Sequence, residues 1–389
     1  MAIGRSSNES FVSPFLVHAS RKGATLSFLG GCSKSETFGR TLPSFTKKFE
    51  HSKHSFSATP LRFRAADRQF VIYNVAETVS AGSDVRERVK KSLLITAIKT
   101  PFLPTGAIDF ATFDQLVEQQ ISSGVNGLVV GGTTGEGHLM SETELLGLIE
   151  HAASKFGDKL VIVGNTGGNN TSKALSNTRK GFAKGMHAAL QINPYYGKTS
   201  QAGLLQHLSR LLEEGPAIIY NVPGRTGQDI KPEVILSLKS NPNLLGVKEC
   251  AGNNRIGLYK DEGVMCWSGN DDECFAGRHA SGSGVISVAS NIIPNLMRRL
   301  MDDKSATALN QDLQPLISWL FCEPNPIAID TALAMTGVVR PVFRLPYVPL
   351  SLEKREEGLS LLNKLSPSDV VGSKREVLRD EDFLLLDSF

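Results

Sequence analysis

Long apolar runs are absent from this chain. A helix that crosses a membrane needs roughly 18 or more consecutive apolar residues, and no segment of the 389-residue sequence approaches that length. The N-terminus also lacks an apolar core of the length found in secretory signal peptides. We therefore expect neither a membrane-spanning segment nor attachment to a membrane.

Cysteine is scarce, and its distribution argues against two further classes of protein. The five cysteines are widely spaced and form no C-x-x-C pair, whereas disulfide scaffolds and zinc sites need regular, closely spaced cysteines. We expect no metal site, and we expect most of these thiols to be small buried side chains. The cysteines are Cys32, Cys250, Cys266, Cys274 and Cys322.

An excess of charge of one sign is almost lacking. The formal net charge of +3 is small for this length, which gives no reason to expect nucleic acid as a partner. Before residue 61, eight basic residues and twelve serines stand against three acidic residues, so the remainder is close to neutral. A basic, serine-rich leader is typical of an organelle transit peptide, with a disordered regulatory arm as the alternative. We assign residues 1–60 to a disordered transit peptide and 61–91 to a linker and a short helix.

Short apolar runs alternate with segments of helical periodicity from residue 92 onward. Parallel strands need crossover helices, and eight strand–helix units can close on themselves. We predict an α/β fold, a (β/α)₈ TIM barrel over 92–303 with a C-terminal helical region over 304–389; a doubly wound open sheet is the rival. The predicted strands are Leu93–Thr100, Gly127–Gly132, Leu160–Gly164, Ala188–Ile192, Ala217–Asn221, Leu244–Lys248, Met265–Ser268 and Val285–Val288.

The helical segments carry start signals. The clearest is Ser141 followed three residues later by Glu144, which predicts a capping box. The other predicted helices are Phe110–Ser123, Ser172–Lys184, Gln201–Glu213, Pro232–Leu238 and Pro294–Asp303.

Lys248 stands inside the otherwise apolar run that predicts the sixth strand. A cation there is either a strand-end lysine that extends to water or a desolvated lysine with a lowered pKa. In the second case, part of the amine is neutral at physiological pH and can attack a carbonyl to form a Schiff base. The surrounding strands decide between these two interpretations.

The other reactive side chains follow predicted strands, where a barrel enzyme places its chemistry. The glycine-rich loop 131–137 offers hydroxyls and backbone N–H groups to a carboxylate, although a plain turn is the alternative. It has neither a Walker pattern nor the G-x-G-x-x-G spacing. Tyr195 and Tyr196 follow the fourth strand, and Tyr220 and Arg225 end the fifth, where a phenol can relay protons and a guanidinium can bind a carboxylate.

Six motifs in this order resemble one known family. GGTTGEG, NPYYGKTS, IIYNVPGRT, GVKE, WSGNDD and GVISV are similar to dihydrodipicolinate synthase (4-hydroxy-tetrahydrodipicolinate synthase), in its plant plastid form. The resemblance extends from Ser92 to the C-terminus. It implies a class I aldolase-type lyase of the plastid stroma that condenses pyruvate with aspartate semialdehyde in lysine synthesis. It also implies a homo-oligomer, a dimer of dimers, that uses no cofactor.

The resemblance assigns roles to eight residues. Lys248 would form the imine, Tyr220 would shuttle protons, and Arg225 would bind the carboxylate of the aldehyde. Thr134 would hold the pyruvate carboxylate. Thr133 and the Tyr196 of a neighbouring subunit would be partners of Tyr220 in the proton relay. Gly269 and the backbone carbonyl of Ile286 would lie close to the site. An imine makes the pyruvate methyl acidic enough for a tyrosinate-like base, and the enamine then attacks the aldehyde.

The chain departs from the family pattern at a regulatory site. In related enzymes lysine inhibits at the subunit interface, and Asn169 and Tyr195 of that site are retained. Lys173, however, stands where the family has an acid, and Glu142 stands where plant members have tryptophan. Leu145 replaces a common histidine. We expect weak or altered inhibition by lysine, because Lys173 repels the effector's amino group.

A second departure is a segment, Glu273 to Ser283, that is one residue shorter than the family pattern. It contains Gly277 and Gly282, and a glycine costs roughly 1 kcal/mol relative to alanine within a helix. We expect this stretch to be weakly helical, which puts closure of the barrel onto the eighth strand in question.

Two rival functions remain open. Related lyases that act on sialic acid or 2-oxo-3-deoxy sugar acids share the lysine and the tyrosine, but Arg225 favours the synthase. A barrel that has lost activity and regulates its homologues is the second rival. The intact Lys248 and Tyr220 count against it.

Overall fold

The computed structural model describes residues 84–389. The predicted transit peptide and most of the predicted linker, up to residue 83, lie outside the described residues. The described part opens with a helix at 84–90. Within it, no helix is both long and apolar enough to cross a membrane.

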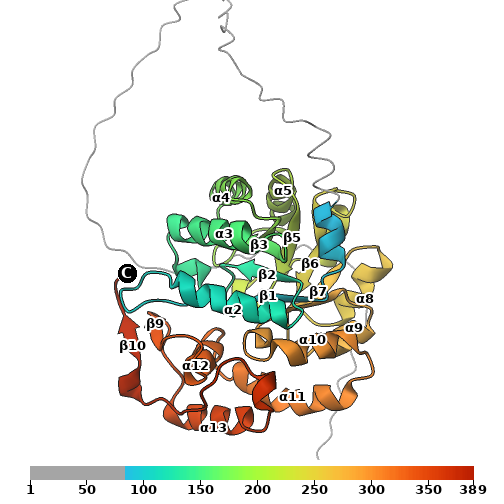
Figure 1. Ribbon diagram of the computed structural model, residues 1–389. Helices are drawn as coiled ribbons and strands as arrows, with labels where there is room; N and C mark the ends of the chain where they lie inside the picture. The colour runs from blue at the N-terminus through green and yellow to red at the C-terminus, as the bar shows by residue number, and fades with distance from the viewer. Residues whose placement is uncertain (1–83) are drawn as a thin grey trace, which may run out of the picture. The chain divides into compact units, whose positions relative to one another are not determined.

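Eight parallel strands form a closed barrel, so the barrel prediction is confirmed and the open sheet is wrong (Figure 1). Each strand pairs with its neighbours in sequence, and the barrel closes where Ile95 pairs with Ile286. The strands are β1 (Leu94–Ala97), β2 (Gly127–Val130), β3 (Val161–Asn165), β4 (Ala188–Ile192), β5 (Ala217–Asn221), β6 (Leu244–Glu249), β7 (Cys266–Ser268) and β8 (Gly284–Ser287).

Helices surround the barrel, and the strands are therefore buried on both faces. One apolar cluster fills the space between strands and helices, and a smaller one, which contains Ile95, Val163 and Trp267, fills the barrel interior. The helices are α2 (Phe110–Ser122), α3 (Glu142–Phe156), α4 (Thr171–Ala183), α5 (Gln201–Leu212), α6 (Pro223–Thr226), α7 (Pro232–Ser237), α8 (Asn254–Asp261), α9 (Cys274–His279) and α10 (Pro294–Asp302).

The predicted capping box at the start of α3 is confirmed. The Ser141 side chain accepts a hydrogen bond from the Glu144 N–H, and the Ser141 N–H donates to Glu144 Oε2 at 2.9 Å. Two of the donors left free at the helix N-terminus are satisfied in this way. The helix therefore starts at the position that its sequence indicates.

The glycine-rich stretch after β7 forms a helix of only six residues, α9. The chain leaves it through Ser281, whose φ of 64° is in the left-handed region, and Arg278 donates to the Gly282 carbonyl at 2.8 Å. β8 nevertheless pairs with both β7 and β1. The short helix therefore does not prevent closure of the barrel.

The segment after the barrel is helical but also contains a small sheet that no sequence pattern predicted. Its parallel strands β9 (Val342–Arg344) and β10 (Leu384–Leu386) pair in register. The Arg344 guanidinium is buried between the rings of Phe102 and Phe389 and forms an ion pair with Glu144. The helices here are α11 (Thr307–Leu320), α12 (Ile327–Met335) and α13 (Leu352–Leu362).

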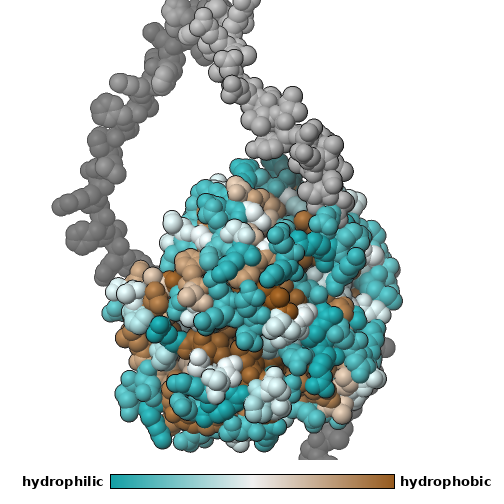
Figure 2. Space-filling view, viewed as in Figure 1, coloured by the Kyte–Doolittle hydropathy of each residue, from teal (hydrophilic) through white to brown (hydrophobic). Residues whose placement is uncertain are grey.

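Polar residues cover most of the face seen in Figure 2, and apolar residues gather in its lower half, around α12.

The cysteines of the described residues are all free. Cys266 and Cys274 are buried, as predicted for most of the thiols, whereas Cys250 is half-buried and Cys322 is exposed. Among residues 84–389, no group of three or more His, Cys, Asp or Glu side chains is placed to hold a metal ion.

Candidate active site

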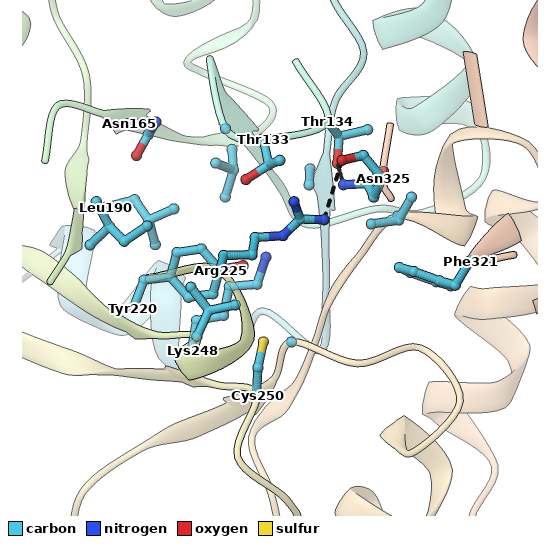
Figure 3. Close-up of a pocket in the computed structure, with 17 residues that line it drawn as sticks. Thr133, Thr134, Asn165, Leu190, Tyr220, Arg225, Lys248, Cys250, Phe321 and Asn325 are labelled. Carbon is cyan, nitrogen blue, oxygen red and sulfur yellow. Dashed lines mark hydrogen bonds between the residues drawn. The ribbon is translucent and has the colours of Figure 1, made fainter. Parts of the chain in front are cut away.

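A pocket opens at the C-terminal end of the barrel, where parallel barrels carry their active sites. Six of the eight residues singled out from the sequence line it (Figure 3). They come from the ends of β2, β5, β6 and β7 and the loops after them. These six residues are Thr133, Thr134, Tyr220, Arg225, Lys248 and Gly269.

Lys248 points into this pocket and not to solvent. Its residue is only 6% exposed, and its Nζ lies 4.5 Å from the centre of the Tyr220 ring. Burial is the main cause that lowers the pKa of Lys248, and the positive charge of Arg225 lowers it further, against opposing effects of Cys250 and Asp271. The interpretation of Lys248 as a lysine extending to water is therefore wrong. Burial therefore shifts Lys248 toward the neutral amine, which is the form that can attack a carbonyl.

The register of β5 and β6 places Tyr220 beside Lys248, although the register shifts earlier in the pair, between Ala217 and Ile218. The next pair along these strands, Asn221 and Glu249, faces outward because side chains alternate along a strand. Asn221 Nδ2 donates to Glu249 Oε1 at 2.8 Å. This bond fixes the register at the level of the two inward side chains.

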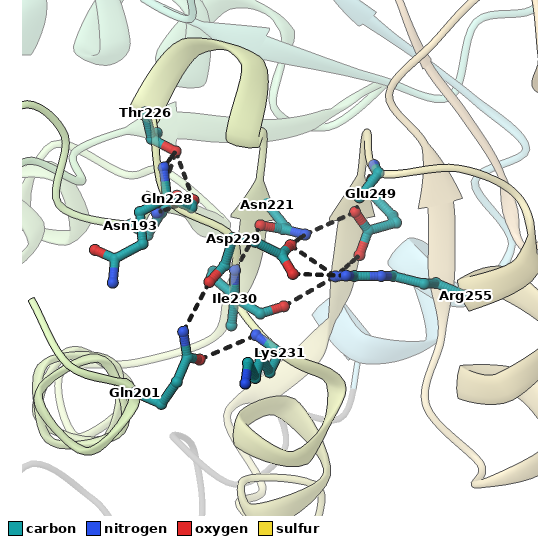
Figure 4. A network of polar contacts seen from close by, with 11 residues as sticks. Asn193, Gln201, Asn221, Thr226, Gln228, Asp229, Ile230, Lys231, Glu249 and Arg255 are labelled. Atoms are coloured by element: carbon teal, nitrogen blue, oxygen red, sulfur yellow. Dashed lines mark hydrogen bonds and ion pairs between the residues drawn. The ribbon is translucent and has the colours of Figure 1, made fainter. Parts of the chain in front are cut away.

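A further polar network supports the outward pair (Figure 4). Asn221 Nδ2 also donates to Asp229 Oδ1 at 2.9 Å, and Arg255 binds both oxygens of Asp229, at 2.8 and 2.6 Å. A two-point contact of this kind fixes both partners in direction as well as distance. The strand ends that carry Tyr220 and Lys248 are therefore held from outside the barrel.

Tyr220 is a neutral phenol in this setting. Burial raises its pKa well above the ordinary value, and the nearby Cys250 thiol adds to the shift, against the opposing charge of Arg225. No hydrogen bond from Tyr220 to Thr133 is present among the described residues. A hydroxyl in this state is a proton donor.

The loop after β2 places Thr133 and Thr134 on the opposite side of the pocket. Thr134 is buried and Thr133 is half-buried. The loop folds tightly: a Cβ on Gly137 would lie 1.9 Å from the Gly131 carbonyl oxygen, so this position has no room for a side chain. Glu136 has a left-handed φ of 56°. This turn presents two hydroxyls side by side, as the sequence predicts.

Arg225 enters the pocket from α6, at the end of β5. Its Nη2 donates to the backbone carbonyl of Asn325 at 3.2 Å (Figure 3). Gly269 also lines the pocket, and a Cβ there would come within 2.3 Å of the Cys250 Sγ and 3.0 Å of the Lys248 Cε. A glycine is therefore needed here if Lys248 is to keep this position.

Two residues singled out from the sequence do not line the pocket. Tyr196 is 95% exposed, with a left-handed φ of 65°. Ile286 is fully buried in β8, and Val288, two residues further on, lines the pocket instead.

The predicted regulatory residues are only partly brought together. Asn169 and Tyr195 line a second cavity, which also contains Tyr196. Glu142 forms an ion pair with Lys180 on the neighbouring helix α4. Lys173 is exposed in the first turn of α4.

Sequence reasoning missed several residues that line the pocket. Asn325 comes from the segment after the barrel, and its Nδ2 donates to Thr134 Oγ1 at 3.1 Å although 191 residues separate them. Phe321 lines the pocket from the same segment, and Cys250 lies beside Tyr220. The one signal for Asn325 was its place between two prolines, which marks an irregular segment but gives no spatial neighbour.

Comparison with known proteins places this geometry in a family. A model described as the dihydrodipicolinate synthetase family matches residues 90–365. The chloroplastic 4-hydroxy-tetrahydrodipicolinate synthase of Nicotiana tabacum is 55% identical over 300 residues, which are 77% of this chain and 84% of that protein. The chloroplastic synthase 2 of Triticum aestivum is 54% identical over 303 residues, 77% of this chain and 80% of that protein.

A solved structure agrees with these matches. The chloride-inhibited dihydrodipicolinate synthase from Acinetobacter baumannii, complexed with pyruvate, is 34% identical and superposes with a TM-score of 0.67. The match covers 70% of this chain and 98% of that chain.

Proposed function

This chain belongs to the dihydrodipicolinate synthetase family, and from that premise we propose that its pocket condenses pyruvate with L-aspartate 4-semialdehyde through a Schiff base on Lys248. The product is 4-hydroxy-tetrahydrodipicolinate, and the reaction belongs to lysine biosynthesis by the diaminopimelate route. The observation that carries the proposal is the buried contact of Lys248 Nζ with the Tyr220 ring, at 4.5 Å. It pairs a nucleophile with a proton carrier in one pocket.

The proposed reaction starts with attack of the neutral Lys248 amine on the ketone of pyruvate. Loss of water leaves an imine, which withdraws electrons from the methyl group, so a methyl proton can leave and an enamine forms. The enamine carbon then bonds to the aldehyde carbon of the second substrate, and the aldehyde oxygen takes up a proton. Ring closure through the amino group of that substrate releases Lys248. Tyr220 carries protons in these steps, because its ring lies against the amine and burial keeps its hydroxyl protonated.

Each substrate has a carboxylate, and the pocket offers a separate anchor for each. The hydroxyl of Thr134 and the neighbouring N–H groups of its loop suit the carboxylate of pyruvate. Arg225 suits the carboxylate of the aldehyde, since a guanidinium binds a carboxylate with two parallel hydrogen bonds. The carbonyl of Ile286 remains a proposed contact near the site.

We assign Tyr196 to the pocket of a second copy of this chain. A tyrosine that is 95% exposed and held at a left-handed φ has little reason to be there in an isolated subunit. A homo-oligomer, arranged as a dimer of dimers, would place Tyr196 beside Tyr220 and Thr133 of its neighbour. An active protein that sediments only as a monomer would contradict this assignment.

Chloroplastic relatives support a plastid location, with residues 1–60 as the transit peptide. We assign the barrel to residues 92–303 and the segment that completes the pocket to 304–389.

The test of the proposed activity is consumption of aspartate semialdehyde together with pyruvate, followed as formation of the cyclic dicarboxylate. We expect turnover with this aldehyde and none with sialic acid or 2-oxo-3-deoxy sugar acids. Cleavage of either sugar acid would favour a lyase of the same superfamily. Absence of turnover with every substrate would favour a regulatory homologue.

We also expect lysine to inhibit this protein weakly. The side chain of Lys173 would repel an effector amino group, and Glu142 is engaged with Lys180. Two unit charges 4 Å apart interact with about 1 kcal/mol in water, so the exchange of repulsion for attraction amounts to about 2 kcal/mol. Lys173→Glu should therefore lower the half-inhibitory lysine concentration by roughly thirtyfold. Lys304→Glu is the matched control, because Lys304 is an exposed lysine that forms no ion pair within residues 84–389. Tight inhibition of the unaltered protein would contradict the prediction.

A further inference from the structure

The segment after the barrel reaches the pocket through Asn325, which is 5% exposed. Its side chain donates to Thr134 Oγ1 at 3.1 Å, and its backbone carbonyl accepts from Arg225 Nη2 at 3.2 Å (Figure 3). Thr134 and Arg225 are the two residues proposed to bind the two substrate carboxylates. A single residue from outside the barrel therefore contacts both anchors.

A second attachment ties the same segment to the same loop. Asp330, in the first turns of α12, receives a hydrogen bond from Lys99 Nζ at 2.7 Å, and Lys99 also forms an ion pair with Glu136. Glu136 follows Thr134 by two residues. All three charged residues are at least 97% buried, with exposures of 2% for Lys99, 1% for Glu136 and 3% for Asp330.

This buried cluster holds two carboxylates against one ammonium. One oxygen of each carboxylate, Glu136 Oε2 and Asp330 Oδ1, has no partner among the described residues. Two like charges without water favour retention of one proton. Burial is the first cause that raises the pKa of Asp330 well above its usual range, Glu136 raises it further, and the ammonium of Lys99 opposes both.

The other charged and titratable groups around the cluster are few. His138 and Tyr347 form a hydrogen bond with each other at 2.8 Å. The charges of Glu136 and Arg225 both affect the pKa of each of these two residues. Arg344 stacks on the Phe102 ring that Lys99 also approaches. None of the three forms an ion pair with Lys99, Glu136 or Asp330 within the described residues. Within the described residues, Lys99 is therefore the cation that pairs with Asp330.

We propose that Asn325 is a positioning residue for both carboxylate-binding groups, and that the Lys99–Glu136–Asp330 cluster holds Asn325 in position. The inference rests on the proposed function, because it names the groups that set the affinity of that pocket for its two substrates. The segment after the barrel is then part of the active site. It fixes the Thr134 hydroxyl through a side chain and the Arg225 guanidinium through the backbone.

The two contacts predict different effects for different substitutions. Asn325→Ala removes the donor to Thr134 but keeps the backbone acceptor for Arg225, so the KM for pyruvate should rise about fivefold to tenfold while the KM for the aldehyde changes less than about twofold. Asp330→Ala removes the anchor of α12 and should raise both KM values by about fivefold or more. Asp330→Asn keeps an acceptor for Lys99 without the extra charge, and should restore both KM values.

The experiment measures kcat and both KM values for these three variants, with thermal unfolding as the check on folding. Glu323→Gln, in the same segment but paired with Lys354 at the surface, is the control expected to match the unaltered protein. Unchanged KM values in Asn325→Ala, or equal losses in Asp330→Asn and Asp330→Ala, would overturn the proposal. If Asp330→Ala does not fold, Asn325→Ala decides. A wild-type protein that consumes no aspartate semialdehyde would instead refute the proposed function.

Discussion

Replacing Lys248 with methionine abolishes the covalent trapping of pyruvate by borohydride and lowers kcat by more than about 10²-fold. Borohydride reduces an imine to a stable secondary amine, so mass spectrometry of the wild-type protein should place the pyruvate adduct on Lys248. Methionine has a similar length and fits a buried position, so the pocket is expected to keep its shape. Loss of a general acid or base typically lowers the rate by about 10²–10⁴-fold. The loss of kcat in this variant is expected to exceed the lower end of that range, because the group that forms the bond to pyruvate is itself removed.

The pH dependence gives this prediction a second readout. Only the neutral amine attacks a ketone, and burial lowers the pKa of Lys248. The rate of imine formation should therefore rise with pH and level off below the pKa of an ordinary lysine. A profile that levels off only near pH 10 or above would show that the amine is not desolvated when it reacts.

Lys260→Met is a suitable control for the Lys248 experiment, because Lys260 is an exposed lysine on α8. It should trap pyruvate as the wild type does. Trapping at wild-type level in the Lys248 variant, with the adduct on another lysine, would remove Lys248 from the mechanism.

The sequence predicted those parts of the fold and site that depend on local pattern. Apolar runs with intervening helices were enough to predict the barrel, and the Ser141–Glu144 spacing was enough to predict a helix start. Lys248, Tyr220 and Arg225 could be found because each follows or ends a strand, and parallel strands in a barrel bring their ends together.

What the sequence could not predict depends on contacts between distant segments. Asn325 acquires its role only when α12 docks beside the loop after β2, and no periodicity encodes that docking. The pairing of β9 with β10 was missed for the same reason, since three-residue strands give almost no alternation to detect.

To predict the contact of Lys248 with Tyr220, both the local sequence pattern and the contacts of the folded chain are needed. Strand order makes β5 and β6 neighbours, but the register shift between Ala217 and Ile218 means that counting residues along the strands does not give the pair. The side-chain bond between Asn221 and Glu249 marks the correct register, and it is visible only in the folded chain.

Replacing Tyr220 with phenylalanine should lower kcat by roughly 10²–10⁴-fold and still leave the protein able to form the imine. The ring remains against Lys248, so packing in the pocket is kept and only the hydroxyl is lost. Borohydride should trap pyruvate on Lys248 in this variant, more slowly than in the wild type. A variant that still traps pyruvate but has a much lower kcat has lost a proton carrier. A variant that had lost packing in the pocket would show a loss of both trapping and kcat.

Tyr259→Phe provides the matched control for the role of the Tyr220 hydroxyl. Tyr259 is also fully buried, but its hydroxyl has no hydrogen-bond partner among the described residues and does not line the pocket. Removing it should leave kcat within about twofold, because no hydrogen bond is broken.

The pKa of Tyr220 is raised, so its hydroxyl stays protonated through neutral pH, and the loss in Tyr220→Phe should be the same from pH 6 to pH 9. A loss that appears only on the alkaline side would mean that a tyrosinate of ordinary pKa does the work, and a kcat within tenfold of the wild type would mean that another group carries the proton.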